Sequence, residues 1–414
     1  EQHPQHGVEG CVPDQIPRAV FQHHRLRRAG HQLYHPLCAC RHEQDSSRSH
    51  HDTVEIDVPH SAADAVGMVR AVVLGDVAMT VPLVWSLARR YPHLRITVLS
   101  SPFARVLFDS MAPNVGFMEA DLKNEYRGVK GLNALYRRLT AKQFTAIADL
   151  HNVLRSGYLR MRFNIDRYRV EHIDKHRRER RQLVATTGKQ LVQLPSVFEL
   201  YADVLARLGY PVDMEFDSMF PPTGGNIRLI SPLVGEKKPF QQWIGIAPFG
   251  AYQGKTYPLP LMEGVIDELT RRHPSCRIFL FGDGSERERL ALDAMADSRK
   301  NCINASAVLG SVYNELVLMS HLDVMLSMDS AAMHLASIAG ATVVSVWGAT
   351  HPLAGYTGWR QRADDVVQAD LSCRPCSISG NRPCLRGDYA CLTSIEPGRV
   401  ADSVDRVLVR YGGV

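Results

Sequence analysis

Apolar runs of strand length alternate with amphipathic segments along most of this chain. In the first half, residues 95–100 (RITVLS) and 144–150 (FTAIADL) are short apolar runs that close on a polar or chain-turning stretch. A third run, residues 69–76 (VRAVVLGD), ends in Gly75-Asp76, and the following residues 77–92 place their apolar positions at helical spacing. This order predicts the strand-helix-strand units of a parallel sheet.

The same alternation restarts after residue 240. Four apolar runs have the length of buried strands, and helical segments such as residues 260–273 (PLMEGVIDELTRRH) separate them. The intervening residues 221–240 are rich in Pro and Gly and show no clear period, which indicates a domain boundary. A last helix near residues 397–411 has an apolar face that fits either domain. The four runs are residues 243–249, 277–284, 324–329 and 342–348.

Two doubly wound α/β domains follow from this pattern, residues 67–225 and 240–414. Residues 1–66 fit neither domain. They hold ten of the eighteen histidines and show neither a helical nor an alternating period, so we expect an unstructured or aberrant N-terminal extension. Metal binding by this His-rich tract is the open alternative.

Composition narrows the class of protein. The chain has 414 residues, of which 45% are apolar, which is enough for two cores. A net charge of +5 suits an anionic partner without requiring nucleic acid. No apolar run approaches the roughly 18 to 20 residues of a membrane span, and no secretion signal opens the sequence. We therefore expect a soluble, cytoplasmic protein.

The stretch SMDSAAMHLASIAG, residues 327–340, combines a carboxylate with a helix start made of small residues. In open α/β sheets, ligands bind at the carboxyl ends of strands, where the free amides of a following helix attract an anion. The backbone of residues 330–333 is therefore a candidate phosphate site. Asp329 suits sugar hydroxyls, with capping of the helix as the alternative. The residues at this helix start are Ser330, Ala331, Ala332, Met333 and His334.

Two neighbouring loops of the second half add to this candidate site. Lys255 lies on a Gly-containing loop after a strand and could pair with a pyrophosphate, although a lone loop lysine is usually only solvated. After the next strand, Gly282 and Gly284 allow close backbone approach, and Glu286 can accept from the two hydroxyls of a ribose. Together the three loops describe a site for a nucleotide diphosphate.

These motifs resemble the ADP-heptose:lipopolysaccharide heptosyltransferases of glycosyltransferase family nine. The similarity rests on LGDVAMTVP, IAPFGAYQGKTYP, FLFGDG and above all SMDSAAMHLASIAGATVVSVWGATHP, and it spans about residues 69–410. The resemblance implies the GT-B fold, in which two Rossmann-like domains face each other across a cleft. It also implies an inverting transfer of heptose from ADP-heptose to the inner core of lipopolysaccharide, with no metal or other cofactor required. The acceptor-binding domain would be residues 67–225 and the donor-binding domain residues 240–414.

The resemblance assigns the base to Asp76. Inversion needs a base for the acceptor hydroxyl, and the departing diphosphate needs its growing charge stabilised. Lys255 and the amides of residues 330–333 suit the second task. Capping of a helix that starts near Val77 is the alternative role for Asp76, and local packing is the alternative role for His334.

The acceptor side is less specific. Asp149 and Arg155 are candidate contacts, and KHRRERR, residues 175–181, fits an anionic glycolipid at the inner surface of the inner membrane. A solvated basic face is the alternative. The short first strand, with Val72 or Val73 where family members have a serine, leaves open a catalytically impaired relative, and another nucleotide sugar also remains open. An NAD-dependent oxidoreductase is disfavoured because no G-x-G-x-x-G opens either domain.

A cysteine cluster near the end has the spacing C-x2-C-x7-C-x6-C. The first pair is typical of zinc ligands, whereas the second spacing is irregular. Reduced thiols that pack a loop are favoured, and structural zinc and disulfides remain open. The four residues are Cys373, Cys376, Cys384 and Cys391.

Overall fold

The computed structural model describes residues 64–69 and 74–412. All of these belong to one unit of the chain, Val58–Val414. The expected N-terminal extension lies outside the described residues, apart from its last three residues. Of those three, Ala65 and Val66 belong to a strand, so the first domain starts slightly before residue 67.

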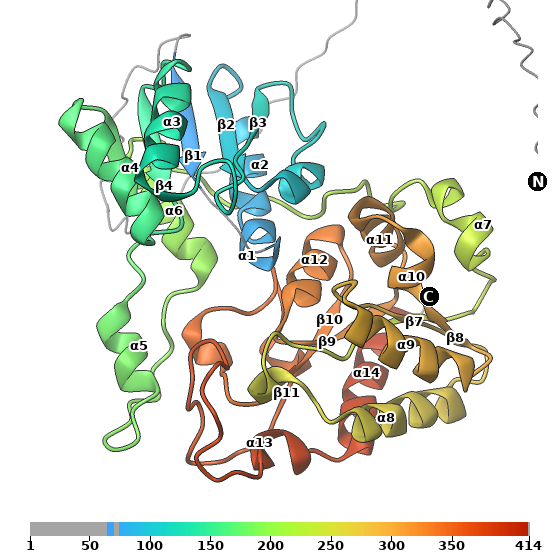
Figure 1. Ribbon diagram of the computed structural model, residues 1–414. Coiled ribbons are helices and arrows are strands. Elements are labelled where there is room, and N and C mark those ends of the chain that lie inside the picture. The colour runs from blue at the N-terminus through green and yellow to red at the C-terminus, as the bar shows by residue number, and fades with distance from the viewer. Residues whose placement is uncertain (1–63, 70–73, 413–414) are drawn as a thin grey trace, which may run out of the picture. The chain divides into compact units, whose positions relative to one another are not determined.

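The first sheet has five parallel strands in the order β3-β2-β1-β4-β5 (Figure 1). Successive residues face opposite sides of the sheet: Val66 and Ala148 belong to one hydrophobic cluster, whereas Ala65 and Ile147 belong to another. Both faces are therefore covered, as expected of a parallel sheet. The strands are β1 (Ala65–Val69), β2 (Arg95–Ser100), β3 (Val115–Glu119), β4 (Ala146–Asp149) and β5 (Arg169–His172).

Two pairs of helices cover the two faces of this sheet. One pair, α2 and α6, packs together, and the other pair, α3 and α4, likewise packs together. The helices of this half are α1 (Leu74–Ala78), α2 (Val81–Arg90), η1 (Pro102–Leu107), α3 (Gly128–Thr140), α4 (Leu154–Ile165), α5 (Arg177–Leu183) and α6 (Val197–Arg207).

The first strand lies four residues earlier than expected. Ala65 pairs with Arg95 at the start of β2, and the Thr145 hydroxyl lies 3.1 Å from the backbone nitrogen of Ala65. These contacts fix the register of β1 upstream of the apolar run. Gly75 and Asp76 consequently lie in the short helix α1 and not at the end of a strand. Val72 and Val73 lie outside the described residues.

The second sheet has six parallel strands in the order β11-β10-β9-β6-β7-β8. Its central strands are buried on both faces, which explains why they read as continuous apolar runs. The strands are β6 (Trp243–Ala247), β7 (Arg277–Leu280), β8 (Cys302–Asn304), β9 (Val324–Met328), β10 (Val343–Trp347) and β11 (Val366–Gln368).

The helices of the second half surround this sheet. The C-terminal helix α14 packs against α8 and against the strands β9, β10 and β11, so it belongs to this half. The expected boundary segment carries η2 and α7. The bounds are η2 (Ile227–Leu229), α7 (Ser231–Val234), η3 (Gln253–Lys255), α8 (Leu259–Arg272), α9 (Glu286–Asp297), α10 (Ala305–Leu309), α11 (Val312–Met319), α12 (Ala331–Ala339), η4 (Pro352–Ala354), η5 (Ala363–Asp365), α13 (Ala390–Thr393) and α14 (Pro397–Gly412).

The two sheets are joined through one continuous hydrophobic cluster, which contains residues of α2 and α6 as well as of α11 and α12. Trp359 reinforces the junction: its indole nitrogen donates to the backbone oxygen of Phe216 at 3.0 Å, and its ring packs edge-on against Phe198. Helix α1 of the first half also packs directly on α12 of the second (Figure 1).

Candidate active site

The loops that follow β6, β9 and β10 meet at the carboxyl edge of the second sheet, because these three strands are neighbours. The backbone nitrogen of Ala349, after β10, donates to the oxygen of Gly254, after β6, at 2.8 Å. Strand β9 lies between them and leads into α12. The sequence motifs around residues 255 and 329 therefore come together, as the pattern of strand ends predicts.

Lys255 and Asp329 form an ion pair inside this group of loops. The distance from Nζ to Oδ2 is 3.1 Å, and the side chains are 15% and 8% exposed. The Thr350 hydroxyl donates to the same carboxylate oxygen at 2.8 Å. Lys255 is therefore not the solvated loop lysine of the alternative interpretation. Asp329 finds its partners in the neighbouring loops and not in the helix that follows it, so helix capping is not its role here.

Two glycines hold the stem of Lys255 in place. A Cβ on Gly380 would lie 2.4 Å from the Lys255 Cγ, and a Cβ on Gly250 would lie 2.7 Å from the Lys255 Cβ. Both distances are too short for a Cβ atom at position 250 or 380. The Lys255 side chain can therefore pack against the backbone at these two positions only because both residues are glycine. Gly380 was missed by sequence reasoning. Its one signal is the Ser-Gly turn, in which it adopts a φ of +76°.

Helix α12 starts directly after this ion pair. Ser330 is its N-cap residue but makes no side-chain capping hydrogen bond, and its hydroxyl lies 3.2 Å from that of Ser327. The first amides of a helix have no partner within it, so they favour an anion. Ala331 and Ala332 are half-buried, whereas the Met333 and His334 side chains are buried.

Gly75 brings the candidate base against this helix start. A Cβ at Gly75 would lie 2.9 Å from the Ala331 Cα and 3.4 Å from the His334 ring. Asp76, the next residue, is half-buried in the first turn of α1. Since α1 starts before Asp76, this residue does not cap a helix beginning near Val77. The two motifs, far apart in sequence, thus lie on helices in direct contact.

The loop between β7 and α9 holds Gly282 and Gly284, and Glu286 directly follows it as the first residue of α9. Gly284 has a φ of +80°, a left-handed conformation that favours glycine. Glu286 is exposed. Sequence reasoning missed Glu288, whose carboxylate accepts from the backbone nitrogen of Asp283 at 2.8 Å. Burial raises the pKa of Glu288.

Asp149 has a structural role in the first half. Its side chain is 2% exposed, and one carboxylate oxygen accepts from the backbone nitrogens of His151 and Asn152 at 3.0 and 2.8 Å. The other oxygen pairs with Arg160 at 2.9 Å. We expected Asp149 to contact the acceptor, but a buried and occupied carboxylate instead shapes the loop before α4. Arg155, at the start of α4, is exposed.

The cysteine cluster surrounds a buried arginine. Arg374 is 4% exposed, and its guanidinium donates to four backbone oxygens and to the side chain of Gln368. Burial lowers the pKa of Arg374 and raises that of Cys391 to about 11, which favours the protonated thiol. Within residues 64–69 and 74–412, no three His, Cys, Asp or Glu side chains are placed to hold a metal ion. In the described part of the chain, the free thiols are Cys276, Cys302, Cys373, Cys376, Cys384 and Cys391.

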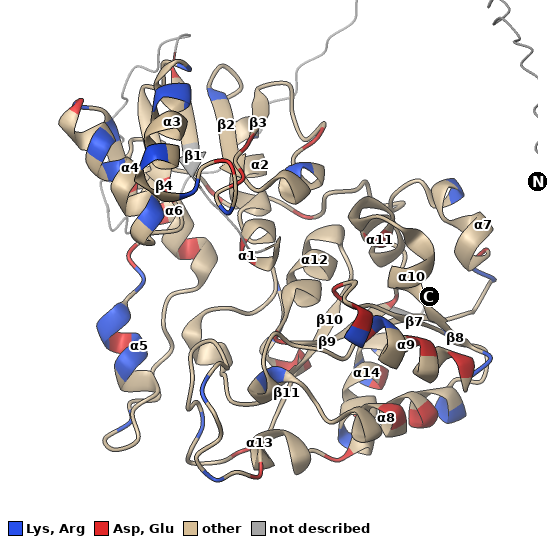
Figure 2. Ribbon diagram, viewed as in Figure 1, with Lys and Arg blue, Asp and Glu red and all other residues tan. Residues whose placement is uncertain are grey.

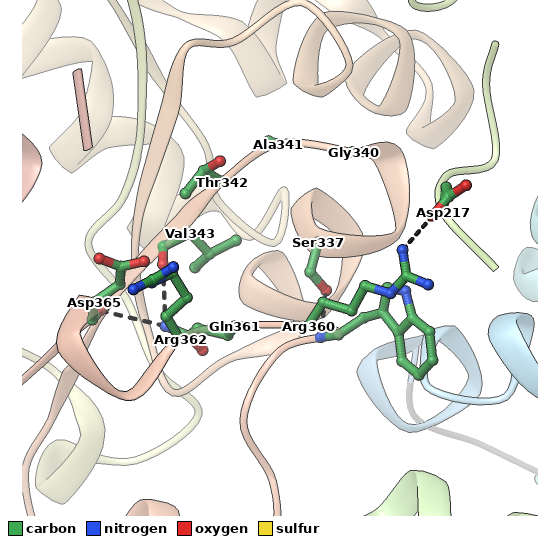
Figure 3. Close-up of a pocket in the computed structure, with 11 residues that line it drawn as sticks. Asp217, Ser337, Gly340, Ala341, Thr342, Val343, Arg360, Gln361, Arg362 and Asp365 are labelled. Atoms are coloured by element: carbon green, nitrogen blue, oxygen red, sulfur yellow. Dashed lines mark hydrogen bonds and ion pairs between the residues drawn. The ribbon is translucent and has the colours of Figure 1, made fainter. Parts of the chain in front are cut away.

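A cavity of about 200 Å³ lies at the amino end of β10 in the second sheet (Figure 3). It forms where α12 ends at Gly340 and β10 begins at Val343, and it contains none of the predicted site residues. Figure 3 shows Gln361 bonded to Val343 and Asp365. We do not assign the reaction to this cavity, because the candidate residues converge at the opposite strand ends.

Comparison with known proteins identifies the family to which this chain belongs. The sequence pattern of glycosyltransferase family 9 (heptosyltransferase) matches residues 132–383, more than half of the chain. A comparison with curated proteins gave no match. A family 9 glycosyltransferase from Veillonella parvula superposes with a TM-score of 0.62 at 17% identity, over 85% of this chain and 99% of its own.

Two E. coli structures have the same fold. ADP-heptose lipopolysaccharide heptosyltransferase II gives a TM-score of 0.60 at 16% identity, over 84% of this chain and 100% of its own. Heptosyltransferase WaaC, solved with ADP, gives 0.57 at 15% identity, over 83% and 99%. The expected α/β fold with two parallel sheets, of GT-B type, is thereby confirmed.

This fold and the family match define a glycosyltransferase. The chain belongs to glycosyltransferase family 9. Asp76 precedes the matched residues, so its role rests on the geometry and on the resemblance stated above.

Proposed function

We propose that this protein is an inverting heptosyltransferase that moves heptose from ADP-heptose to the inner core of lipopolysaccharide. The observation that carries the proposal is the contact of Gly75 with Ala331, since it sets a half-buried carboxylate, Asp76, beside a helix start suited to a diphosphate. A base and an anion site must adjoin in a single displacement. The two E. coli neighbours, described as acting on or solved with adenine nucleotides, favour ADP-heptose as the donor.

The donor would lie along the carboxyl edge of the second sheet. Lys255 and the first amides of α12 would bind the diphosphate, and the β7-α9 loop with Gly282 and Gly284, together with Glu286, would bind the nucleoside. Asp329 has one carboxylate oxygen engaged by Lys255 and Thr350, and its other oxygen would accept from a hydroxyl of the sugar. The residues assigned to the helix start are Ser330, Ala331, Ala332, Met333 and His334.

Asp76 would remove the proton of the acceptor hydroxyl as its oxygen attacks the anomeric carbon. The bond to the diphosphate breaks on the opposite side, so the configuration inverts. Lys255 and the α12 amides stabilise the charge that develops on the departing ADP, and such stabilisation needs donors aimed in advance. The ion pair with Asp329 and the close packing against Gly250 and Gly380 fix the position of Lys255 in advance.

The acceptor would approach from the first half of the protein. Arg155 is the proposed contact to an anionic group, because it is exposed at the start of α4. Asp149 would act indirectly by fixing the preceding loop. The acceptor is a glycolipid, so we place the enzyme at the inner face of the inner membrane. Among the described residues, no helix is long and apolar enough to cross a bilayer.

Calorimetric titration of the full chain with ADP-heptose, ADP, UDP and NAD tests the donor assignment. ADP and ADP-heptose should bind, and NAD should not. Tighter binding of UDP than of ADP would instead assign a different nucleotide sugar. The Lys255→Met variant should weaken ADP by about tenfold or more, since a buried charge-assisted contact to phosphate is lost. Unchanged ADP affinity in that variant would contradict the placement of the diphosphate.

A further inference from the structure

Helix α4 exposes a line of apolar side chains. Leu154 is 92% exposed, Met161 48% and Ile165 66%. These positions are seven and four residues apart, so at 3.6 residues per turn they project within about 40° of one another. A soluble helix usually turns such a line toward the core. Here the core is contacted by the other face, with Ser156, Leu159 and Phe163.

Arginines border this line. Arg155 is exposed next to Leu154, and α5 begins beside the same end of α4, where Arg177 donates to the backbone oxygen of Asn152 at 3.2 Å. Helix α5 has the sequence RRERRQL. Its exposed arginines are Arg177, Arg178 and Arg181.

One arginine of α5 serves a different purpose. Arg180 hydrogen-bonds the hydroxyl of Tyr356 and packs 4.8 Å from the centre of its ring, so it faces the second half of the protein. The other three arginines of this helix, Arg177, Arg178 and Arg181, are exposed. In Figure 2, blue segments of the ribbon mark Lys and Arg positions on α3, α4 and α5.

We propose that the exposed face of α4, with the exposed arginines of α5, docks on an anionic lipid bilayer. Leu154, Met161 and Ile165 enter the headgroup boundary, and the arginines contact lipid phosphates. An apolar line bordered by basic residues is the pattern of an interfacial helix, whose binding combines apolar burial with attraction to anionic lipid. This deepens and rests on the proposed function, because a glycolipid acceptor lies in such a bilayer.

Charge complementarity selects the bilayer over a second copy of the chain. A symmetric dimer through this face would oppose arginines of one copy to arginines of the other, and such like-charge contacts are unfavourable. An anionic bilayer has the opposite charge and offers an apolar layer beneath it. Leu154 begins α4 directly after the loop shaped by Asp149, so the docked helix presents the acceptor side of the protein to the membrane.

Co-sedimentation of the full chain with vesicles tests this proposal. The protein should bind vesicles of phosphatidylcholine mixed with phosphatidylglycerol, and much less those of phosphatidylcholine alone. The variant L154Q/M161Q/I165Q should lose about tenfold or more in partitioning, because three apolar side chains no longer enter the interface. R177Q/R178Q/R181Q should lose about fivefold for each arginine, with a weaker dependence on salt.

A matched control is available on the other half of the protein. Leu229, Leu233 and Phe240 are 47%, 49% and 93% exposed, so L229Q/L233Q/F240Q removes similar exposed apolar surface elsewhere and should bind vesicles like the wild type. Equal partitioning of the α4 variant and the wild type would overturn the proposal. So would a wild-type dimer in analytical ultracentrifugation that the α4 variant converts to monomers, because the occupant would then be a second copy.

Titration with ADP-heptose separates this proposal from the proposed function. The α4 variant should keep wild-type donor affinity and melting temperature, since the changed side chains are on the surface of the first half. Vesicle binding without binding of ADP-heptose would support the docking face and contradict the proposed donor. Binding of ADP-heptose without vesicle binding would support the proposed donor and contradict the docking face.

Discussion

Replacing Gly75 by alanine tests the contact on which the active site depends. The new Cβ would lie 2.9 Å from the Ala331 Cα and 3.2 Å from its Cβ, whereas ordinary contacts start at 3.4 Å. Because the nearest atom is backbone, no side-chain rotation relieves the clash, and α1 and α12 must separate by about half an ångström. Such overpacking costs about 1–3 kcal/mol of unfolding free energy.

The rate of transfer should fall more than the stability. The alanine itself favours helix over glycine by up to about 1 kcal/mol, so the net loss of stability is small and the melting temperature drops by only a few degrees. Displacement of a reacting group by about 1 Å can cost about 100-fold in rate, so we expect kcat to fall by about ten- to 100-fold. Donor affinity should fall by less than kcat, because Lys255 keeps its contact with the diphosphate when the first amides of α12 shift.

The assay is transfer from ADP-heptose to lipopolysaccharide inner-core acceptor, followed by mass spectrometry, with calorimetry and melting curves on the same samples. Gly116→Ala is the matched control, since a Cβ there has its nearest neighbour at 3.8 Å and should be tolerated. Wild-type kcat and melting temperature for G75A would refute the reasoning, as would an equal loss in G116A.

Two further predictions concern the loops after β10. Thr350→Val should weaken ADP-heptose about tenfold in calorimetry, because Asp329 loses a hydrogen bond to its charged carboxylate, and Thr350→Ser should restore most of the affinity; a Ser variant as weak as Val would contradict this. Burial, then Arg374 and Lys189, lower the pKa of His351 from 6.5 to about 4. The folded protein therefore binds fewer protons than the unfolded chain, and stability is lost as pH falls from 6.5 towards 4, by about 1–2 kcal/mol after allowing for partial exposure. His351→Gln should flatten the melting temperature over this range, whereas His93→Gln, at an exposed site, should not.

Much of the fold could be predicted because buried parallel strands have continuous apolar sequences. Residues 95–100 were expected as a strand and are β2, and the four predicted runs of the second half each contain a strand. The missed strands are β3, β5, β8 and β11. All four are the end strands of their sheets and are partly exposed, so they lack the apolar run that marks a central strand.

The site could be predicted in part. Lys255 and Asp329 were predicted to lie at the carboxyl edge of the second sheet, because both directly follow strands of a parallel sheet, and the structure places them there. Their ion pair was not foreseen, since it depends on side-chain geometry across two loops. Asp149 was expected to face the acceptor and is instead buried. Its carboxylate completes the hydrogen bonds of a turn, and residue type alone does not distinguish these roles.

The position of the first strand was predicted wrongly for a different reason. The apolar run VRAVVLGD indicated the first strand, yet pairing with β2 and the bonds to Thr145 shift that strand to Ala65–Val69. Register is set by a partner strand distant in sequence, so a local pattern fixes it only approximately. The shift places Asp76 on a helix that packs against α12.

The most direct test of the reaction is the transfer rate of Asp76→Asn, measured beside its affinity for ADP-heptose. Asparagine keeps the size of the side chain but cannot accept a proton. We predict that kcat falls by about 10² to 10⁴, the usual contribution of a general base, while the dissociation constant of ADP-heptose stays within about threefold of wild type. Transfer at the wild-type rate would contradict the assignment of Asp76 as the base.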